Sequence, residues 1–144
     1  MSIQDLVREF HQAYDVTIQH EPKLPDTYEE ELLRRDLLEE EFDEFKEAQS
    51  LEDLVGIADA LADMAYIIYG TALVYGINLD AVVREVHRSN MTKLGADGQP
   101  IRRSDGKVLK GPLYSPPNIE GVLGLDDGLD DYGVPHGVVG DGES

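Results

Sequence analysis

The chain has 144 residues, of which 30 are acidic and 12 are basic, and its formal net charge at pH 7 is −18. Such a surface repels phosphates, so we expect no broad binding to nucleic acid or to an anionic membrane. The absence of cysteine excludes disulfides, zinc–thiolate sites and thiol nucleophiles. The first residues lack the basic flank and apolar core of a signal peptide, and we therefore expect a cytoplasmic protein.

The spacing of apolar residues predicts four helices within residues 1–90. The first runs from Ile3 to Tyr14 with Ser2 as its N-cap, and the second runs from Tyr28 to Gln49. The first helix carries three apolar side chains on one face: Leu6, Phe10 and Ala13. A connection rich in proline separates these two helices.

Ser50 is the predicted N-cap of the third helix, and Asp53, three residues later, completes a capping-box-like pair. This helix continues to Tyr75, and Gly76 ends it. Asn78 then caps a fourth helix, whose apolar residues recur at helical spacing: Leu79, Val82, Val83 and Val86.

The character of the chain changes after Asn90. The turn pairs at 97–98 and 105–106 bracket Ile101 and precede Val108, which predicts a small hairpin or a loose hooked loop. Residues 120–144 are rich in Gly and Asp and poor in large apolar residues, and we expect this acidic tail to be disordered. Residues 1–119 therefore form the predicted folded domain.

Acidic residues interrupt the apolar stripe of the second helix. Glu41 and Glu44 continue the row of Leu33 and Leu37, and Glu40 lies one turn before Glu44. Most glutamate-rich helices simply expose a solvated acidic face. Burying unpaired carboxylates, however, costs several kcal/mol each, on the order expected for desolvated charges. Oxygen-only ligands on facing helices suit a hard divalent cation such as Mg²⁺, with Mn²⁺ as an alternative. We therefore predict that Glu40, Glu41 and Glu44 are metal ligands.

Asp59 and Asp63 lie one turn apart inside the apolar third helix. An acidic first turn favoured by the helix dipole accounts for Asp53, but Asp59 and Asp63 lie too far along the helix for that explanation. These two aspartates also make the stretch 56–77 a poor membrane span. We predict that both are metal ligands.

Other catalytic centres fit the sequence less well. A di-iron carboxylate bundle uses Glu-x-x-His pairs, and no histidine follows a glutamate at that spacing. A Gly-x-Ser-x-Gly nucleophile motif is also absent. At the end of the fourth helix, Asn90 and Lys93 offer an amide and a cation. Beside an acid–metal site, these groups suit a phosphate chain rather than only the helix dipole.

Together these segments resemble the all-α nucleoside triphosphate pyrophosphatases, which include MazG-like proteins, dimeric dUTPases and phosphoribosyl-ATP pyrophosphohydrolases. Their pattern is Glu-Glu-x-x-Glu followed by Glu-x-x-Asp. Glu40, Glu41 and Glu44 match the first half, and Asp63 matches the end of the second. Ala60 stands where that pattern has Glu, so we expect neighbouring Asp59 to substitute, and the number of metal ions stays open.

The resemblance implies an all-α bundle of four to five helices, completed by dimerisation, that cleaves a nucleoside triphosphate between its α and β phosphates. Glu40 is the proposed base or water-orienting group, with Glu41 beside it in the catalytic centre. The groups proposed to bind the nucleotide or the outgoing pyrophosphate are Asn90, Lys93, Lys107, Lys110 and Tyr66. The resemblance favours dUTP slightly over broad deoxynucleotide activity, with phosphoribosyl-ATP as the alternative.

The apolar circumference of the third helix predicts a two-fold homodimer. The side chains expected at its interface are Tyr66, Ile67, Tyr69 and Leu73. A rival interpretation from a different class is an acidic helical binding module without catalysis, supported by the net charge and the tail. The two interpretations differ in where the acids lie, because a binding module of that kind needs them exposed.

Overall fold

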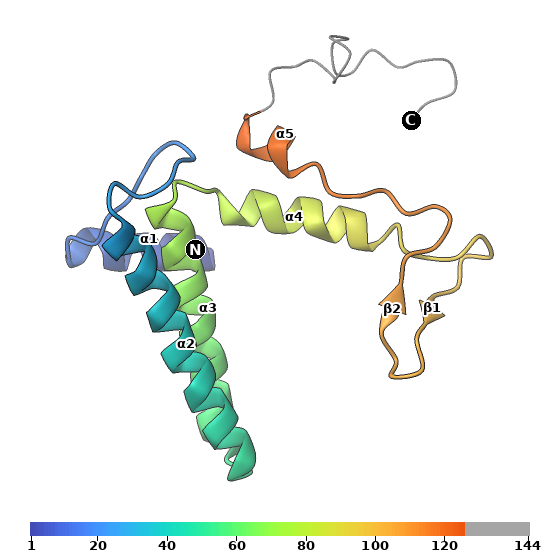
Figure 1. The fold of residues 1–144 in the computed structure, drawn as a ribbon, viewed down its shortest axis with the longest axis horizontal. Helices are drawn as coiled ribbons and strands as arrows, with labels where there is room; N and C mark the ends of the chain where they lie inside the picture. The colour runs from blue at the N-terminus through green and yellow to red at the C-terminus, as the bar shows by residue number, and fades with distance from the viewer. Residues whose placement is uncertain (126–144) are drawn as a thin grey trace. The chain divides into compact units, whose positions relative to one another are not determined.

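The computed structural model describes residues 1–125 of the chain (Figure 1). These residues divide into two compact units, Met1–Asp80 and a second that begins at Ala81. Helices dominate the described residues, and the only strands among them form one two-stranded sheet. The predicted all-α class is therefore confirmed, whereas most of the predicted disordered tail, residues 126–144, lies outside the described residues.

Helix α1 spans Ile3–Ala13 and begins as the sequence predicts. The Ser2 hydroxyl accepts a hydrogen bond from the Asp5 backbone N–H at 3.2 Å, and the Asp5 carboxylate accepts one from the Ser2 backbone N–H at 3.1 Å. This capping box satisfies two N–H groups that would otherwise lack partners. The buried face of α1 carries Val7 and His11, whereas the predicted apolar residue Phe10 remains 41% exposed.

Helices α2 (Tyr28–Ser50) and α3 (Leu54–Val74) run side by side (Figure 1). The predicted N-cap of α3 is wrong, because Ser50 is the last residue of α2 and its hydroxyl donates to the Glu47 carbonyl oxygen at 2.8 Å. Asp53 is the actual cap, and its side chain accepts from the Gly56 N–H at 3.0 Å. Glu52, at φ +53°, turns the chain between the two helices.

The connection between α1 and α2 closes against the last turn of α3. The Gln19 backbone N–H donates to the Leu73 carbonyl oxygen at 2.9 Å, and the Gln19 side-chain amide donates to the Val74 carbonyl oxygen at 2.6 Å. Gly76 follows at φ +69°, and a Cβ there would collide with the Glu21 carbonyl oxygen. Gly76 therefore ends α3 as predicted, for a steric as well as a conformational reason.

A buried arginine and a buried histidine meet where α1, α2 and α3 pack together. Arg34 donates from Nε to the Thr71 hydroxyl and from Nη2 to the Ile67 carbonyl oxygen, both at 3.1 Å. A Cβ on Gly70 would lie 2.6 Å from Arg34 Nη2 and 2.9 Å from His11 Nε2, so a larger residue there would displace these two side chains. Burial, with the nearby Arg34 charge, lowers the pKa of His11 and favours its neutral form.

The buried apolar residues of the first unit have mostly small side chains, and three of them lie at the end of α3. These residues are Val7, Ala48, Ala60, Ala72, Leu73 and Val74. Small residues let neighbouring helix backbones approach closely. Among the described helices, α3 is the one long and apolar enough to cross a membrane by length and composition, although Asp59 and Asp63 interrupt it.

Helix α4 (Leu79–Asn90) begins at the end of the first unit and continues into the second. The predicted hairpin is confirmed: strands β1 (Ile101–Arg102) and β2 (Val108–Leu109) pair antiparallel, with Ile101 opposite Leu109.

Hydrogen bonds tie α4 to the extended segment that follows the hairpin. Arg88 donates to the Glu85 carboxylate at 2.7 Å and to the Pro116 carbonyl oxygen at 3.1 Å, and the Ser89 hydroxyl donates to the Ser115 carbonyl oxygen at 2.7 Å. The Arg88 hydrogen bond is the largest cause that lowers the pKa of Glu85 to about 2. These contacts fix the segment along α4.

The predicted start of the disordered tail at residue 120 is wrong, because residues Ile119–Leu123 form the short helix α5. The Asn118 side chain caps this helix by accepting from the Gly121 N–H, and Gly124 ends it in the left-handed conformation. Local capping therefore orders a stretch whose composition alone indicates disorder.

Candidate metal centre

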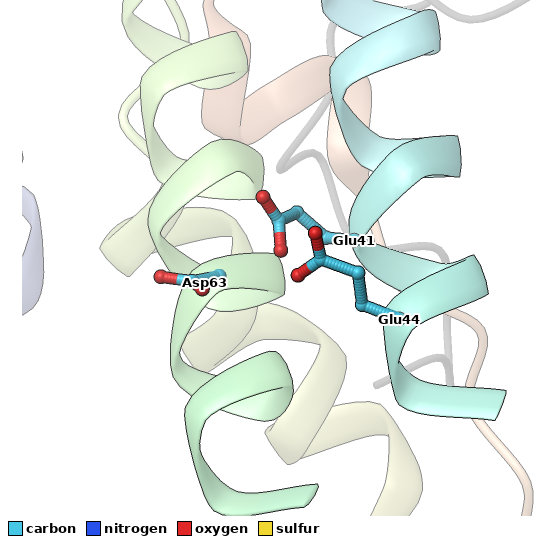
Figure 2. A group of neighbouring side chains, drawn as sticks. All are labelled: Glu41, Glu44 and Asp63. Carbon is cyan, nitrogen blue, oxygen red and sulfur yellow. The ribbon is translucent and has the colours of Figure 1, made fainter. Parts of the chain in front are cut away.

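Three carboxylates converge between α2 and α3. Glu41 and Glu44 project from α2 toward α3, which carries Asp63 (Figure 2). One oxygen of each carboxylate lies within 4.8 Å of the others. Helical geometry explains the placement, since residues three apart on α2 share a face and antiparallel packing brings Asp63 opposite them.

Like charges and burial dominate the electrostatics of this cluster. Burial, hydrogen bonding to Glu44 and the charges of Glu44, Asp63 and Asp59 raise the pKa of Glu41 to about 7. Burial and the charges of Asp59 and Glu44 also raise the pKa of Asp63. Glu41 and Asp63 therefore resist ionisation until a positive charge compensates them.

One atom of the cluster lacks any hydrogen-bond partner. Glu41 Oε2 is buried and unpaired, and it is the only buried side-chain nitrogen or oxygen atom in this state among the described residues. A buried acceptor left without a partner is costly, and such an atom calls for an explanation in terms of an ion, a water or a function. Hard oxygen donors from two helices fit a divalent cation such as Mg²⁺.

The remaining predicted acids lie around this cluster rather than in it. Asp59 is exposed one turn before Asp63, and its charge contributes to the raised pKa values of Glu41 and Asp63. Glu40 is exposed on α2, outside the converging group. Ala60 is only 2% exposed and belongs to the core, so an acid placed there would be more deeply buried than Asp59 is.

Four of the predicted nucleotide-binding residues belong to the second unit. Asn90 is exposed at the end of α4, and Lys93 follows it in a turn. Lys107 lies in the hairpin turn, where its N–H donates to the Asp105 carboxylate at 3.1 Å. The Lys110 ammonium lies 4.8 Å from the centre of the Tyr114 ring. Their roles stay predictions.

Tyr66 has aromatic neighbours that sequence reasoning missed. It lies on α3 with its ring centre 5.6 Å from that of Phe10, which in turn lies 4.6 Å from the ring centre of Tyr14. The sequence places Phe10 on an apolar face of α1 but does not reveal that this face meets α3. The available signal was the spacing of Phe10 and Tyr14, four residues apart on one helix face.

A family model and two known proteins are similar to this chain. A family model described as phosphoribosyl-ATP pyrophosphohydrolase matches residues 7–90, which include the whole acidic cluster. A candidate NTP pyrophosphohydrolase of known crystal structure, from Exiguobacterium sp. 255-15, is 30% identical in sequence, and the match covers 81% of this chain and 68% of that protein, with a TM-score of 0.44.

A viral relative shares part of the same region. The uncharacterised protein L479 of Acanthamoeba polyphaga mimivirus is 37% identical over 68 residues, which are 47% of this chain. The matched part spans only 25% of that viral protein. On the family match alone, the chain belongs to the phosphoribosyl-ATP pyrophosphohydrolase family.

Proposed function

We propose that the protein is a Mg²⁺-dependent nucleotide pyrophosphohydrolase that cleaves between the α and β phosphates to give a nucleoside monophosphate and pyrophosphate. The observation that carries this proposal is the convergence of Glu41, Glu44 and Asp63, with one buried Glu41 oxygen left unpaired. The rival binding module needs its acids exposed, whereas two members of this cluster are partly buried.

The acids of the first unit divide between two roles in this proposal. Glu41, Glu44 and Asp63 hold the cation, and Asp59 completes the set at its exposed edge. When bound, Mg²⁺ neutralises charge on the phosphate oxygens and lowers the pKa of a coordinated water. Glu40 lies next to Glu41 and is free of the cluster, so it orients the attacking water or accepts its proton.

Four of the five basic side chains of the first unit already have polar partners. Arg34 is buried and donates to Thr71 and Ile67, while Lys46 lies 3.1 Å from the Asp43 carboxylate. The cations proposed for the outgoing pyrophosphate are those predicted from sequence, Lys93, Lys107 and Lys110, which would stabilise the charge that develops on the leaving group. Asn90 is the proposed hydrogen-bonding partner of the sugar or the base.

We propose deoxynucleoside triphosphates as the substrates, with dUTP slightly ahead of the others. Phosphoribosyl-ATP is the second candidate, because the matching family model carries that name. It too is cleaved between α and β phosphates, so the same three carboxylates serve either substrate.

Product identification tests the proposed reaction. The protein is incubated with Mg²⁺ and, separately, with dUTP, the four common deoxynucleoside triphosphates and phosphoribosyl-ATP, and the products are resolved by anion-exchange chromatography. The expected products are the nucleoside monophosphate and pyrophosphate in equal amounts. Orthophosphate as the sole inorganic product, or no turnover of any of these substrates, would contradict the proposal.

We also propose that the protein acts as a cytoplasmic homodimer, but through a different face from that predicted by sequence. Leu73, assigned there to the interface, is only 2% exposed and packs within the first unit. Three apolar side chains at seven-residue spacing stay exposed on α3 instead: Leu54, Leu61 and Ile68. Residues seven apart share a helix face, so this exposed stripe offers a continuous surface for a second copy.

A further inference from the structure

Helices α1 and α3 enclose an aromatic cleft of about 490 Å³ within the first unit. Its lining residues are Leu6, Glu9, Phe10, Ala13, Tyr14 and Tyr66. The Phe10 ring meets the Tyr66 ring edge to face at an interplanar angle of 80°, and it lies tilted by 37° against the Tyr14 ring. All three rings keep solvent-exposed surface, with Tyr66 at 37% and Tyr14 at 69%.

The aromatic cleft adjoins the acidic cluster along α3. Tyr66 lies three positions after Asp63 and seven positions after Asp59. At about 100° of rotation per residue, Asp59 and Tyr66 lie about 20° apart around the helix axis. Tyr66 and the exposed Asp59, which lies one turn before Asp63 of the metal centre, therefore share one face of α3, about two turns apart.

The lining of the cleft favours a flat, uncharged ring over a phosphate. Its walls are aromatic and aliphatic, and its one charged residue, Glu9, is an acid that repels phosphates. Aromatic side chains bind nucleobases by stacking, and every base offers a π face for such contact. The volume also falls in the usual range for small-molecule sites, about 300–1,000 Å³.

We propose that this cleft binds the base of the nucleotide substrate, stacked against Tyr66 and Phe10, while the phosphates extend to the metal centre. The inference rests on the proposed function and adds its base-binding site. It assigns base contact to α1, a helix that carries none of the acids of the metal centre. Tyr66 is thus a substrate-binding residue that does not take part in the chemical step.

Two measurements on the full-length protein test this assignment. Replacing the ring by Tyr66→Leu should raise KM for dUTP roughly 5- to 150-fold, the range expected for losing one base stack, and leave kcat within about twofold. Tyr66→Phe keeps the ring and should stay near wild type. Tyr28→Leu removes an exposed tyrosine outside the cleft and serves as the matched control.

The second measurement needs no catalysis. Saturation-transfer NMR is recorded with metal-free protein and, separately, deoxyuridine, deoxycytidine, deoxyadenosine, deoxyguanosine and thymidine. Wild type and Tyr66→Phe should show saturation transfer to the base of at least one nucleoside, whereas Tyr66→Leu should show none. Nucleoside binding can be measured even if the protein hydrolyses no nucleotide. Failure of the base-binding proposal can therefore be distinguished from failure of the proposed function.

The base-binding proposal is overturned if wild type shows no transfer to any of the five nucleosides. It is also overturned if Tyr66→Leu binds nucleosides and keeps its KM unchanged. A fall in molecular mass by light scattering in Tyr66→Leu, with nucleoside binding retained, would assign the cleft to a second copy of the chain instead.

Discussion

Removing one carboxylate charge from the cluster is expected to abolish turnover. Glu41→Gln and Asp63→Asn should each lower kcat/KM by at least roughly 10³-fold, because each removes a cation ligand and several kcal/mol of charge stabilisation in the transition state. Steady-state kinetics with the preferred triphosphate and Mg²⁺ measure this loss. Both variants should remain folded, since each substitution removes an acid whose raised pKa shows that its ionised form is disfavoured.

Glu47→Gln is the matched control for these variants. Glu47 lies on α2 and is exposed, and it is not one of the three converging acids. Its replacement should leave kcat/KM within about twofold of wild type, and circular dichroism should show the same helix content in all three variants. Wild-type rates in Glu41→Gln or Asp63→Asn would place the active site elsewhere.

Introducing a charge on the exposed stripe of α3 is expected to separate the proposed dimer. Leu61 is 50% exposed and lies between Leu54 and Ile68 on the stripe. Leu61→Glu should raise the dimer dissociation constant at least about 100-fold, because two-fold symmetry buries two unpaired carboxylates in one interface. Sedimentation equilibrium at micromolar concentration should then give the monomer mass.

Leu33→Glu provides the comparison on the neighbouring helix. Leu33 has a similar exposure of 53% but lies on α2 and is not part of the stripe. A dimer that survives Leu33→Glu and dissociates in Leu61→Glu supports the assigned face. The reverse pattern, or a monomeric wild-type protein, would contradict it.

The acidic cluster could be predicted because it depends on local periodicity. Glu41 and Glu44 are three residues apart, and on a helix this spacing fixes them on one face, whatever packs against them. Asp63 could be predicted as a third ligand because a carboxylate deep in an apolar helix is costly to bury unless a cation compensates it. The three residues that converge in the structure are therefore among the predicted ligands.

Features that depend on tertiary packing could not be read in this way. The rotation of α1 decides that Val7 and His11 are buried while Phe10 faces the aromatic cleft, and no local pattern fixes that rotation. Arg34 is buried by its hydrogen bonds to Thr71 and the Ile67 backbone, partners more than 30 residues away. In the same way, the sequence alone does not reveal that Leu73 is buried within the first unit, because its burial depends on how α1 and the following connection pack against α3.

The exact start of α3 could not be predicted from its candidate capping residues. Ser50 and Asp53 are both good N-cap types and stand three residues apart, so composition alone favours neither. The choice depends on where the turn through Glu52 reverses the chain. Short local motifs thus located the helices well but misplaced one boundary by three residues.

The stability of the metal-free protein as a function of pH tests most directly whether the cluster is a cation site. The pKa of Glu41 is about 7 when folded, above its ordinary value of 4.5. The folded state therefore holds this proton more tightly, and the resulting stability is present below about pH 4.5 and lost as the pH rises to about 7. A cation that binds the ionised cluster should restore stability above that range.

Thermal unfolding near pH 5 and near pH 8, with and without millimolar Mg²⁺, makes this measurable. Mg²⁺ should raise the Tm of the wild type by about 4 °C or more near pH 8 and by much less near pH 5. Without metal near pH 8, Glu41→Gln should have a higher Tm than the wild type, and adding Mg²⁺ should change the Tm of this variant little. An equal response to Mg²⁺ in wild type and Glu41→Gln, or no response in wild type at either pH, would contradict a cation site built from these acids.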